Sequence, residues 1–269
     1  MSEYLFGFIG VGNMGGALAK AAAKVIAPEQ ILASSLTMEE TTAFTARVGC
    51  HAGDNAAVAS QCRYIFLGVK PQYMAGMLAE IAPVLAARTD RFVLITMAAG
   101  LTMAQIRGMA GGDYPIIRIM PNTPAAIGSG MILYTTSDEI MEEEREQFLH
   151  GLSAAGRLDA LPESLIDAGC AVSGCGPAFV YLFIEALADG GVECGLPRAK
   201  ALEYAAQTVY GAAQMVLESG QHPGVLKDAV CSPGGTTIVG VHALERGAFR
   251  ADAMNAVCAA YDKSKQFAK

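Results

Sequence analysis

The chain has 269 residues, of which 52% are hydrophobic and 17% are charged, enough apolar material for one large domain or two small ones. Lys and Arg number 19 and Asp and Glu number 26, which gives a net charge of -7. With no basic arm or run, nucleic acid and anionic membrane surfaces are poor partners by charge. Seven cysteines without a Cys-x-x-Cys pair argue against a disulfide framework, a zinc site or any other bound metal.

No stretch of the sequence predicts export or membrane insertion. Residues 1–4 lack the basic region and the following apolar region of a signal peptide. The longest strongly apolar stretch, residues 177–188, is interrupted by Glu185 and is too short to span a bilayer. The sequence therefore predicts a soluble, cytoplasmic protein with reduced thiols.

The first part of the chain alternates between predicted strands and predicted helices. Residues 4–9 are apolar and prone to β structure, a glycine loop follows, and the alanine-rich residues 17–25 predict a helix. Further strands are predicted at residues 31–36, 64–69, 92–97, 116–120, 131–135 and 157–161, with helices at 73–85 and 138–152. This alternation predicts an α/β domain over residues 1–162, a mostly parallel sheet of Rossmann type with helices on both faces.

After residue 162 the pattern becomes helical. Helices are predicted at residues 177–195, 197–219 and 236–247 and from residue 251 onward, with clear breaks at residues 195–197 and 220–224. Residues 163–269 thus form a second, all-α domain. A helical domain this apolar is expected to bury part of its surface against another subunit.

The glycine loop fits the dinucleotide pattern G-x-G-x-x-G. Gly10 permits the tight turn, Gly12 lets the backbone approach a pyrophosphate, and Gly15 lets the helix pack closely on the strand. The helix start offers free N–H groups and a partial positive charge to the phosphates. The complete loop reads as follows: Gly10, Val11, Gly12, Asn13, Met14, Gly15.

The end of the second strand bears on the choice between NAD and NADP. No acid stands there to bond the ribose hydroxyls, and Ser34 and Ser35 offer two hydroxyls to a 2′-phosphate, although no Arg lies beside them. This pattern favours NADPH over NADH, the alternative being that both serines only cap a loop. Lys70, after a later strand, is equally consistent with a cofactor contact and with a solvated surface lysine.

A second glycine-rich turn opens a helix near the C-terminus. Its glycines, Gly234 and Gly235, expose backbone N–H groups, and Ser232, Thr236 and Thr237 add hydroxyls. A substrate carboxylate would be held well there. The alternative is a capped helix start that binds nothing.

These motifs, together with residues 69–72, 120–124 and 173–178, resemble the pyrroline-5-carboxylate reductase family nearly from end to end, and residues 228–237 with 244–249 resemble its signature. The resemblance implies a Rossmann domain followed by a helical domain that interlocks with a second subunit, in a homodimer or higher homo-oligomer. It implies NAD(P)H-dependent reduction of 1-pyrroline-5-carboxylate to L-proline, in proline biosynthesis. Cys175 departs from the serine that the family commonly has, which puts a specific role for that side chain in doubt.

The resemblance also implies residue roles. Thr237 would lie near the ring nitrogen as the catalytic residue, and Glu163 would face the substrate beside the loop of Ser232, Gly234, Gly235 and Thr236. The remaining implied cofactor contacts outside the glycine loop are Ile9, Ser35, Asn55, Val69, Lys70, Pro71, Ala98, Ala99 and Gly100.

A protonated imine already accepts hydride well, so the reaction does not demand a strong general acid, and no histidine stands out as one. A β-hydroxyacid dehydrogenase is disfavoured because Lys200 and Lys227 lack the Asn neighbour that such enzymes need. A reductase of another cyclic imine and a non-enzymatic dinucleotide sensor or scaffold remain alternatives.

Overall fold

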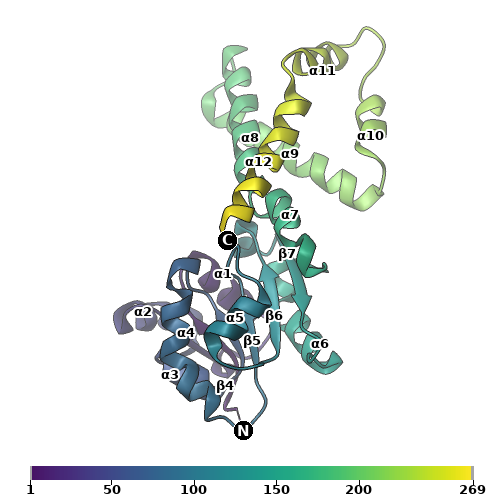
Figure 1. Cartoon of the computed structure of the whole chain (residues 1–269). Helices are drawn as coiled ribbons and strands as arrows, with labels where there is room; N and C mark the ends of the chain where they lie inside the picture. Colours follow the sequence, from purple (N-terminus) through teal and green to yellow (C-terminus); the bar gives the residue numbers. More distant parts are fainter. Residues whose placement is uncertain (1, 268–269) are drawn as a thin grey trace. The chain divides into compact units, whose positions relative to one another are not determined.

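The computed structural model describes residues 2–267, so the outer ends of both predicted domains, residues 1 and 268–269, lie outside the described residues. The chain divides into two compact units (Figure 1). We call residues 176–259 the helical unit and the remainder the sheet unit. Each unit is described by itself below.

The sheet unit is built on eight strands in the order β3-β2-β1-β4-β5-β6-β7-β8. Only β7 runs against its neighbour β6 among these strands, and the other pairs are parallel. The strands are β1 (Tyr4–Ile9), β2 (Ile31–Ser34), β3 (His51–Ala52), β4 (Cys62–Leu67), β5 (Val93–Thr96), β6 (Ile116–Met120), β7 (Gly130–Thr136) and β8 (Gly156–Ala160). The strand order reverses between β1 and β4, and ligands bind beyond the carboxyl ends of strands at such a switch point.

Helices cover both faces of this sheet, as the sequence predicts. Helices α1, α2 and α6 contribute to one apolar cluster with Phe6 and Phe8, whereas α3, α4 and α5 contribute to another with Ile9 and Ile65 (Figure 1). Parallel strands buried on both faces need near-continuous apolar runs, which explains why β1 and β4 lack alternating polar residues. The helices are α1 (Asn13–Ala22), α2 (Met38–Val48), α3 (Asn55–Gln61), α4 (Pro71–Ala86), α5 (Met103–Ala110), α6 (Glu142–Gly151) and α7 (Glu163–Ser173).

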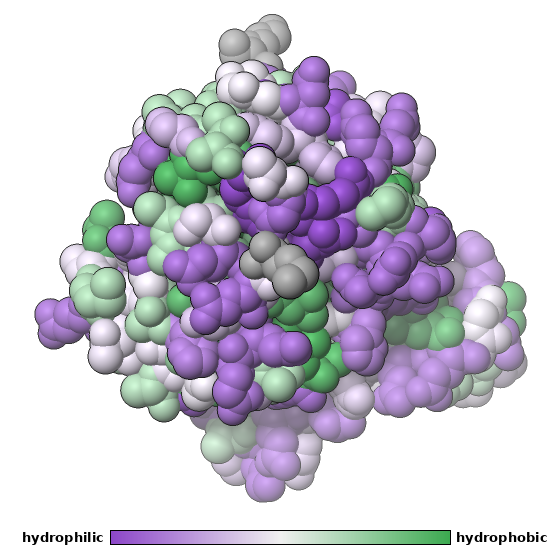
Figure 2. Space-filling view, turned by 90° about the horizontal axis from the view of Figure 1, so that it is seen from below, coloured by the Kyte–Doolittle hydropathy of each residue, from purple (hydrophilic) through white to green (hydrophobic). Residues whose placement is uncertain are grey.

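Near the amino ends of the parallel strands, opposite the carboxyl ends where ligands bind, ion pairs connect neighbouring segments. Glu144 of α6 accepts hydrogen bonds from Arg63 and Arg91 at 2.8 Å each. Asp90 pairs with Arg88 at 2.9 Å. Seen from below, the sheet unit presents a face on which hydrophilic residues predominate (Figure 2).

The helical unit has a small core of its own. Ala188, Ala201 and Ala205 are buried where α8 packs against α9, and many larger apolar side chains are exposed, among them Leu182 at 66%. The helices are α8 (Gly176–Glu193), α9 (Arg198–Ser219), α10 (Pro223–Ala229), α11 (Thr236–Arg246) and α12 (Phe249–Phe267), whose last turns belong to the sheet unit. So much uncovered apolar surface indicates that the unit is completed by another molecule.

The prediction that the longest apolar stretch is too short to span a bilayer was wrong, because a helical stretch runs over Glu163–Glu193, and its most apolar 18-residue window has a mean hydropathy of 1.6. Length and composition alone would let it cross a membrane, with 6% of its most apolar window buried. Helix α7 lies in the sheet unit, where Ile166 packs on Met120 and Leu133, so the domain boundary at residue 162 remains a prediction.

Candidate active site

The glycine loop has the close contacts that its pattern requires. Gly10 adopts φ +91°, and a Cβ at Gly15 would lie 2.1 Å from the carbonyl oxygen of Gly10. A Cβ at Gly68, after β4, would lie 2.4 Å from that same oxygen. At Gly12, by contrast, no heavy atom of the described residues would come within 4 Å of an added Cβ. The loop is therefore packed tightly on the protein side and open at Gly12.

This opening lies at the amino end of α1, for which Gly12 is the N-cap. No side chain among residues 2–267 caps this helix end, and its first turn carries no acid. Unsatisfied N–H groups and the positive end of the helix dipole thus face the open space. An uncapped helix end beside open space is the arrangement that binds the pyrophosphate of a dinucleotide.

A cavity of about 680 Å³ adjoins the loop at the carboxyl ends of β1, β2 and β4. Six of the predicted cofactor residues line it: Ile9, Gly10, Ser35, Asn55, Val69 and Lys70. Its other lining residues are Leu36, Gly68, Gln72, Tyr73, Gly76, Met77 and Glu80. The exposed side chains of Leu36 and Tyr73 supply apolar surface for a flat ring.

The other predicted cofactor residues surround this cavity along the same edge. Val11 and Gly12 form the loop itself, and Asn13, Met14 and Gly15 form the first turn of α1. Pro71 begins α4, and Ala98, Ala99 and Gly100 follow β5, the strand next to β4. Ser34 is 1% exposed and does not line the cavity. All these assignments remain predictions of cofactor contact.

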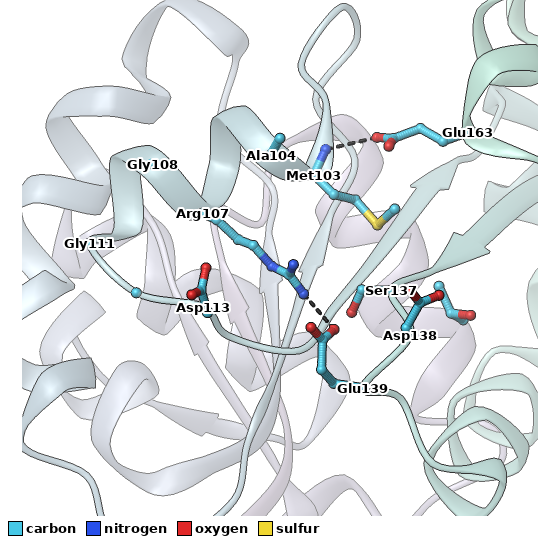
Figure 3. Close-up of a pocket in the computed structure, with 12 residues that line it drawn as sticks. Met103, Ala104, Arg107, Gly108, Gly111, Asp113, Ser137, Asp138, Glu139 and Glu163 are labelled. Atoms are coloured by element: carbon cyan, nitrogen blue, oxygen red, sulfur yellow. Dashed lines mark hydrogen bonds and ion pairs between the residues drawn. The ribbon is translucent and has the colours of Figure 1, made fainter.

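Glu163 is the first residue of α7 and is held by two groups of the sheet unit. Its Oε1 accepts a hydrogen bond from the backbone N–H of Met103 at 2.8 Å (Figure 3). The same oxygen lies 3.4 Å from Nη1 of Arg118. Nη2 of Arg118 donates to Oδ1 of Asp167 at 2.8 Å. Arg118 was not among the predicted site residues, although a lone Arg inside the apolar strand β6 indicates an acidic partner.

A second cavity, of about 710 Å³, also borders Glu163 (Figure 3). Asp113, Asp138 and Glu139 line it as well, and Arg107, its one lining cation, already pairs with Glu139 at 2.5 Å. The surplus of carboxylates makes this cavity a poor site for an anionic substrate.

In the helical unit, the loop of residues 230–235 leads into α11. The N–H of Gly235 donates to the carbonyl oxygen of Ser232 at 3.0 Å, and Gly234 adopts φ +71°. The positive φ of Gly234 favours glycine there, and a Cβ at Gly235 would lie 2.4 Å from Oγ of Ser232, so that side chain would have to turn away.

The amino end of α11, formed by Thr236 and Thr237, is free for an anion. Gly235 is its N-cap, no side chain in the described part of the chain bonds to this end, and the first turn has no acid. Two threonine hydroxyls stand beside unsatisfied N–H groups, a combination that suits a carboxylate. The two predicted parts of the substrate site thus belong to different units: Glu163 to the sheet unit and the loop of residues 230–235 to the helical unit.

Neither histidine near this loop in sequence has the surroundings of a proton-transfer group. Nδ1 of His222 accepts a hydrogen bond from the N–H of Gly224 at 3.0 Å, which caps α10, and His242 is exposed on α11. Within residues 2–267, no cluster of three His, Cys, Asp or Glu side chains could hold a metal ion.

Two protein-family models match the chain. The model of pyrroline-5-carboxylate reductase dimerisation matches residues 163–267, and the model of NADP oxidoreductase, coenzyme F420-dependent, matches residues 5–100. Pyrroline-5-carboxylate reductase of Escherichia coli is 41% identical over 270 residues, which cover 99% of each chain. The chain belongs to the pyrroline-5-carboxylate reductase family. The soybean reductase is 40% identical over 267 residues, 98% of this chain and 96% of the relative.

Solved structures of the family agree with the fold. The pyrroline carboxylate reductase of Plasmodium falciparum with NADP bound has a TM-score of 0.88 at 34% identity, covering 100% of both chains. The Streptococcus pyogenes enzyme has a TM-score of 0.86 at 33% identity over 97% of this chain and 98% of that one. The predicted family and fold class are thereby confirmed, and the match to a dimerisation model over the exposed apolar helices indicates a homo-oligomer.

Proposed function

We propose that this protein reduces 1-pyrroline-5-carboxylate to L-proline with NAD(P)H, as the last step of proline biosynthesis. The observation that carries the proposal is the full-length similarity to named reductases, with both ligand loops present in folded form. A protein that only senses a dinucleotide would have no need of the second loop. The cytoplasm, where reduced cofactors are abundant, is the proposed location.

The glycine loop and the start of α1 would hold the pyrophosphate, and the cavity beside them would hold the adenosine. When bound, the reduced nicotinamide supplies a hydride to the imine carbon. Ala98, Ala99 and Gly100 follow β5 with small side chains, so a flat ring could lie against the backbone there.

The loop of residues 232–237 would bind the substrate carboxylate through the N–H groups at the start of α11. Thr237 would then hydrogen-bond the ring nitrogen and fix the face of the imine that is reduced. An unactivated hydroxyl is too weak an acid to drive proton transfer, so its contribution is positioning. Glu163 is proposed to face the substrate, with Arg118 balancing its charge.

The proposed assembly is a homodimer or a higher homo-oligomer built on the helices after residue 163. Val180, Leu182 and Leu187 of α8 are exposed in the single chain, and burial against a second copy would remove them from water. This burial would also account for the apolar stretch of α7 and α8 without a membrane. No partner among nucleic acids is proposed, given the net charge of -7.

The test is the consumption of reduced cofactor by the purified full chain, followed by absorbance with and without 1-pyrroline-5-carboxylate. Oxidation that requires the imine and yields L-proline supports the proposal. The six-membered imine acid is the matched control for ring size, and it should react much more slowly. No imine-dependent oxidation by folded protein that binds the cofactor would refute the proposal.

A further inference from the structure

The two serine hydroxyls at the end of β2 are already used inside the protein. Oγ of Ser34 donates to Oδ1 of Asn55 at 2.8 Å and lies 3.4 Å from the carbonyl oxygen of Phe8. Oγ of Ser35 donates to Oε2 of Glu40 at 3.0 Å. A hydroxyl has one proton to donate. Both hydroxyl protons thus face acceptors of the protein, so a 2′-phosphate at this strand end would have to replace the bonds to Asn55 and Glu40.

The carboxylate of Glu40 is brought to the strand end by a fixed turn. The N–H of Ser35 donates to Oγ1 of Thr41 at 2.9 Å, and Oγ1 of Thr37 accepts from the N–H of Glu40 at 3.2 Å. These bonds start α2 directly after β2, so its first turn stands beside the cavity residue Ser35. An acid on the helix is thus bonded to the cavity residue Ser35, next to the strand end from which a dehydrogenase for NAD usually presents its acid.

The charges around this end of the cavity oppose a further anion. Glu39 and Glu40 both lie in the first turn of α2 and offset its positive helix end. Glu80, which lines the cavity, approaches Nδ2 of Asn55 at 3.4 Å. Lys70 is the one cation among the lining residues, and it follows β4, two strands away from β2.

We propose that Glu40 sets the cofactor preference of this enzyme by binding the unphosphorylated adenosine ribose and disfavouring a 2′-phosphate. A ribose 2′-hydroxyl can donate to the carboxylate, whereas a phosphate would add nearly two negative charges next to it. The chain therefore uses NADH in preference to NADPH. This inference rests on the proposed function and reverses the preference predicted from the two serines.

The first experiment measures binding without the reaction. Adenosine 5′-monophosphate and adenosine 2′,5′-bisphosphate, which differ only in the 2′-phosphate, are titrated into the full chain by calorimetry. We expect wild type to bind the first at least about tenfold more tightly, because the second places its 2′-phosphate near Glu40. Glu40→Gln should raise affinity for the 2′-phosphorylated probe about tenfold and lower affinity for the other.

Glu39→Gln is the matched control. The substitution removes one negative charge from the same turn of α2, but the hydrogen bond from Ser35 goes to Glu40 and stays intact. This substitution should shift both affinities less than about twofold, since Glu39 is exposed and its charge is screened by water and salt. Glu40→Lys provides a second variant, expected to favour the 2′-phosphorylated probe more strongly than Glu40→Gln.

The second experiment compares kcat/KM for NADH and NADPH in wild type and Glu40→Gln. The ratio should favour NADH in wild type and fall at least about tenfold in the variant. Equal probe affinities in wild type, or a ratio that Glu40→Gln leaves within twofold, would overturn the inference. If the probes behave as expected but no imine is reduced, the proposed function fails and the role of Glu40 in binding stands.

Discussion

Arg118 and Asp167 form an ion pair inside the sheet unit, with Nη2 of Arg118 2.8 Å from Oδ1 of Asp167. Arg118 is 1% exposed, and its Nε has no hydrogen-bond partner among residues 2–267. The guanidinium depends on two carboxylates of α7, since Glu163 is its other partner. The pair therefore joins α7 to β6 and sets the position of Glu163.

Removing Asp167 should destabilise the fold more than its partial exposure suggests. Asp167→Ala leaves a buried cation with only the longer contact to Glu163, and we expect the free energy of unfolding to fall by about 2–4 kcal/mol. Urea titration measures the change. Glu203→Ala, which breaks an exposed pair with Lys200 on α9, should have little effect. Equal losses in the two variants would contradict the structural role of Arg118.

Substituting alanine at Gly12 and at Gly15 should affect different properties, cofactor binding at the first and also stability at the second. Gly12→Ala meets no atom of the described residues and keeps φ −65°, so the melting temperature should hardly change while dinucleotide binding falls by at least about tenfold. Gly15→Ala meets the carbonyl oxygen of Gly10 and should lower the melting temperature as well. Thermal unfolding and cofactor titration on both variants check this. A Gly12→Ala protein that binds normally would refute the pyrophosphate site.

Thr237→Ala should lower kcat/KM for the imine by about tenfold to a hundredfold, because it removes one hydrogen bond to the reacting nitrogen. Cofactor binding should remain intact, because Thr237 lies on α11 of the helical unit and not in the glycine loop. Thr237→Ser keeps the hydroxyl and should restore most of the activity. Unchanged turnover in Thr237→Ala would remove this residue from the proposed mechanism.

A charge on the exposed face of α8 should break the oligomer. Leu182→Asp places a carboxylate where the family comparison indicates dimerisation, and burying an unpaired charge there would cost several kcal/mol. Light scattering should then report a smaller assembly than wild type. Ser60→Asp on α3 of the sheet unit is the control and should leave the mass unchanged. An unchanged mass for Leu182→Asp would place the interface elsewhere.

Asp90 should contribute to the acid stability of the fold. Hydrogen bonds from Arg88 and Ser2 hold the pKa of Asp90 well below its ordinary value of 3.8. A depressed pKa means that the stabilisation is complete above about pH 4 and is lost as the pH falls further toward the folded-state pKa. Asp90→Asn should thus be less stable than wild type at pH 7, and the difference should shrink below pH 4. A difference that grows on acidification would contradict this sign.

Much of the fold could be predicted from the sequence because the strands are strongly apolar. The ranges for β1 and β6 are confirmed to the residue, and β4 begins two residues earlier than predicted. The short β3, His51–Ala52, is exposed and carries no apolar run, so nothing marked it. Helix α1 begins four residues before the predicted helix because the glycines of the loop continue into its first turns.

The site was harder to predict wherever it depends on residues that tertiary structure brings together. Glu40 is six residues beyond Ser34, and only the turn into α2 places its carboxylate on Ser35. Arg118 is conspicuous among the apolar residues of β6, but its carboxylate partners, Glu163 and Asp167, lie on α7 much later in the chain, so the sequence did not pair them. The glycine positions, by contrast, follow from backbone geometry that any Rossmann loop must satisfy.

The most direct test of the central claim is the stoichiometry of the reaction. Purified full chain is incubated with 1-pyrroline-5-carboxylate and limiting reduced cofactor, and L-proline is quantified by chiral chromatography beside the absorbance change. The account predicts one L-proline for each cofactor oxidised, with Gly12→Ala forming almost none. Cofactor oxidation without proline, or proline formed equally by Gly12→Ala, would contradict it.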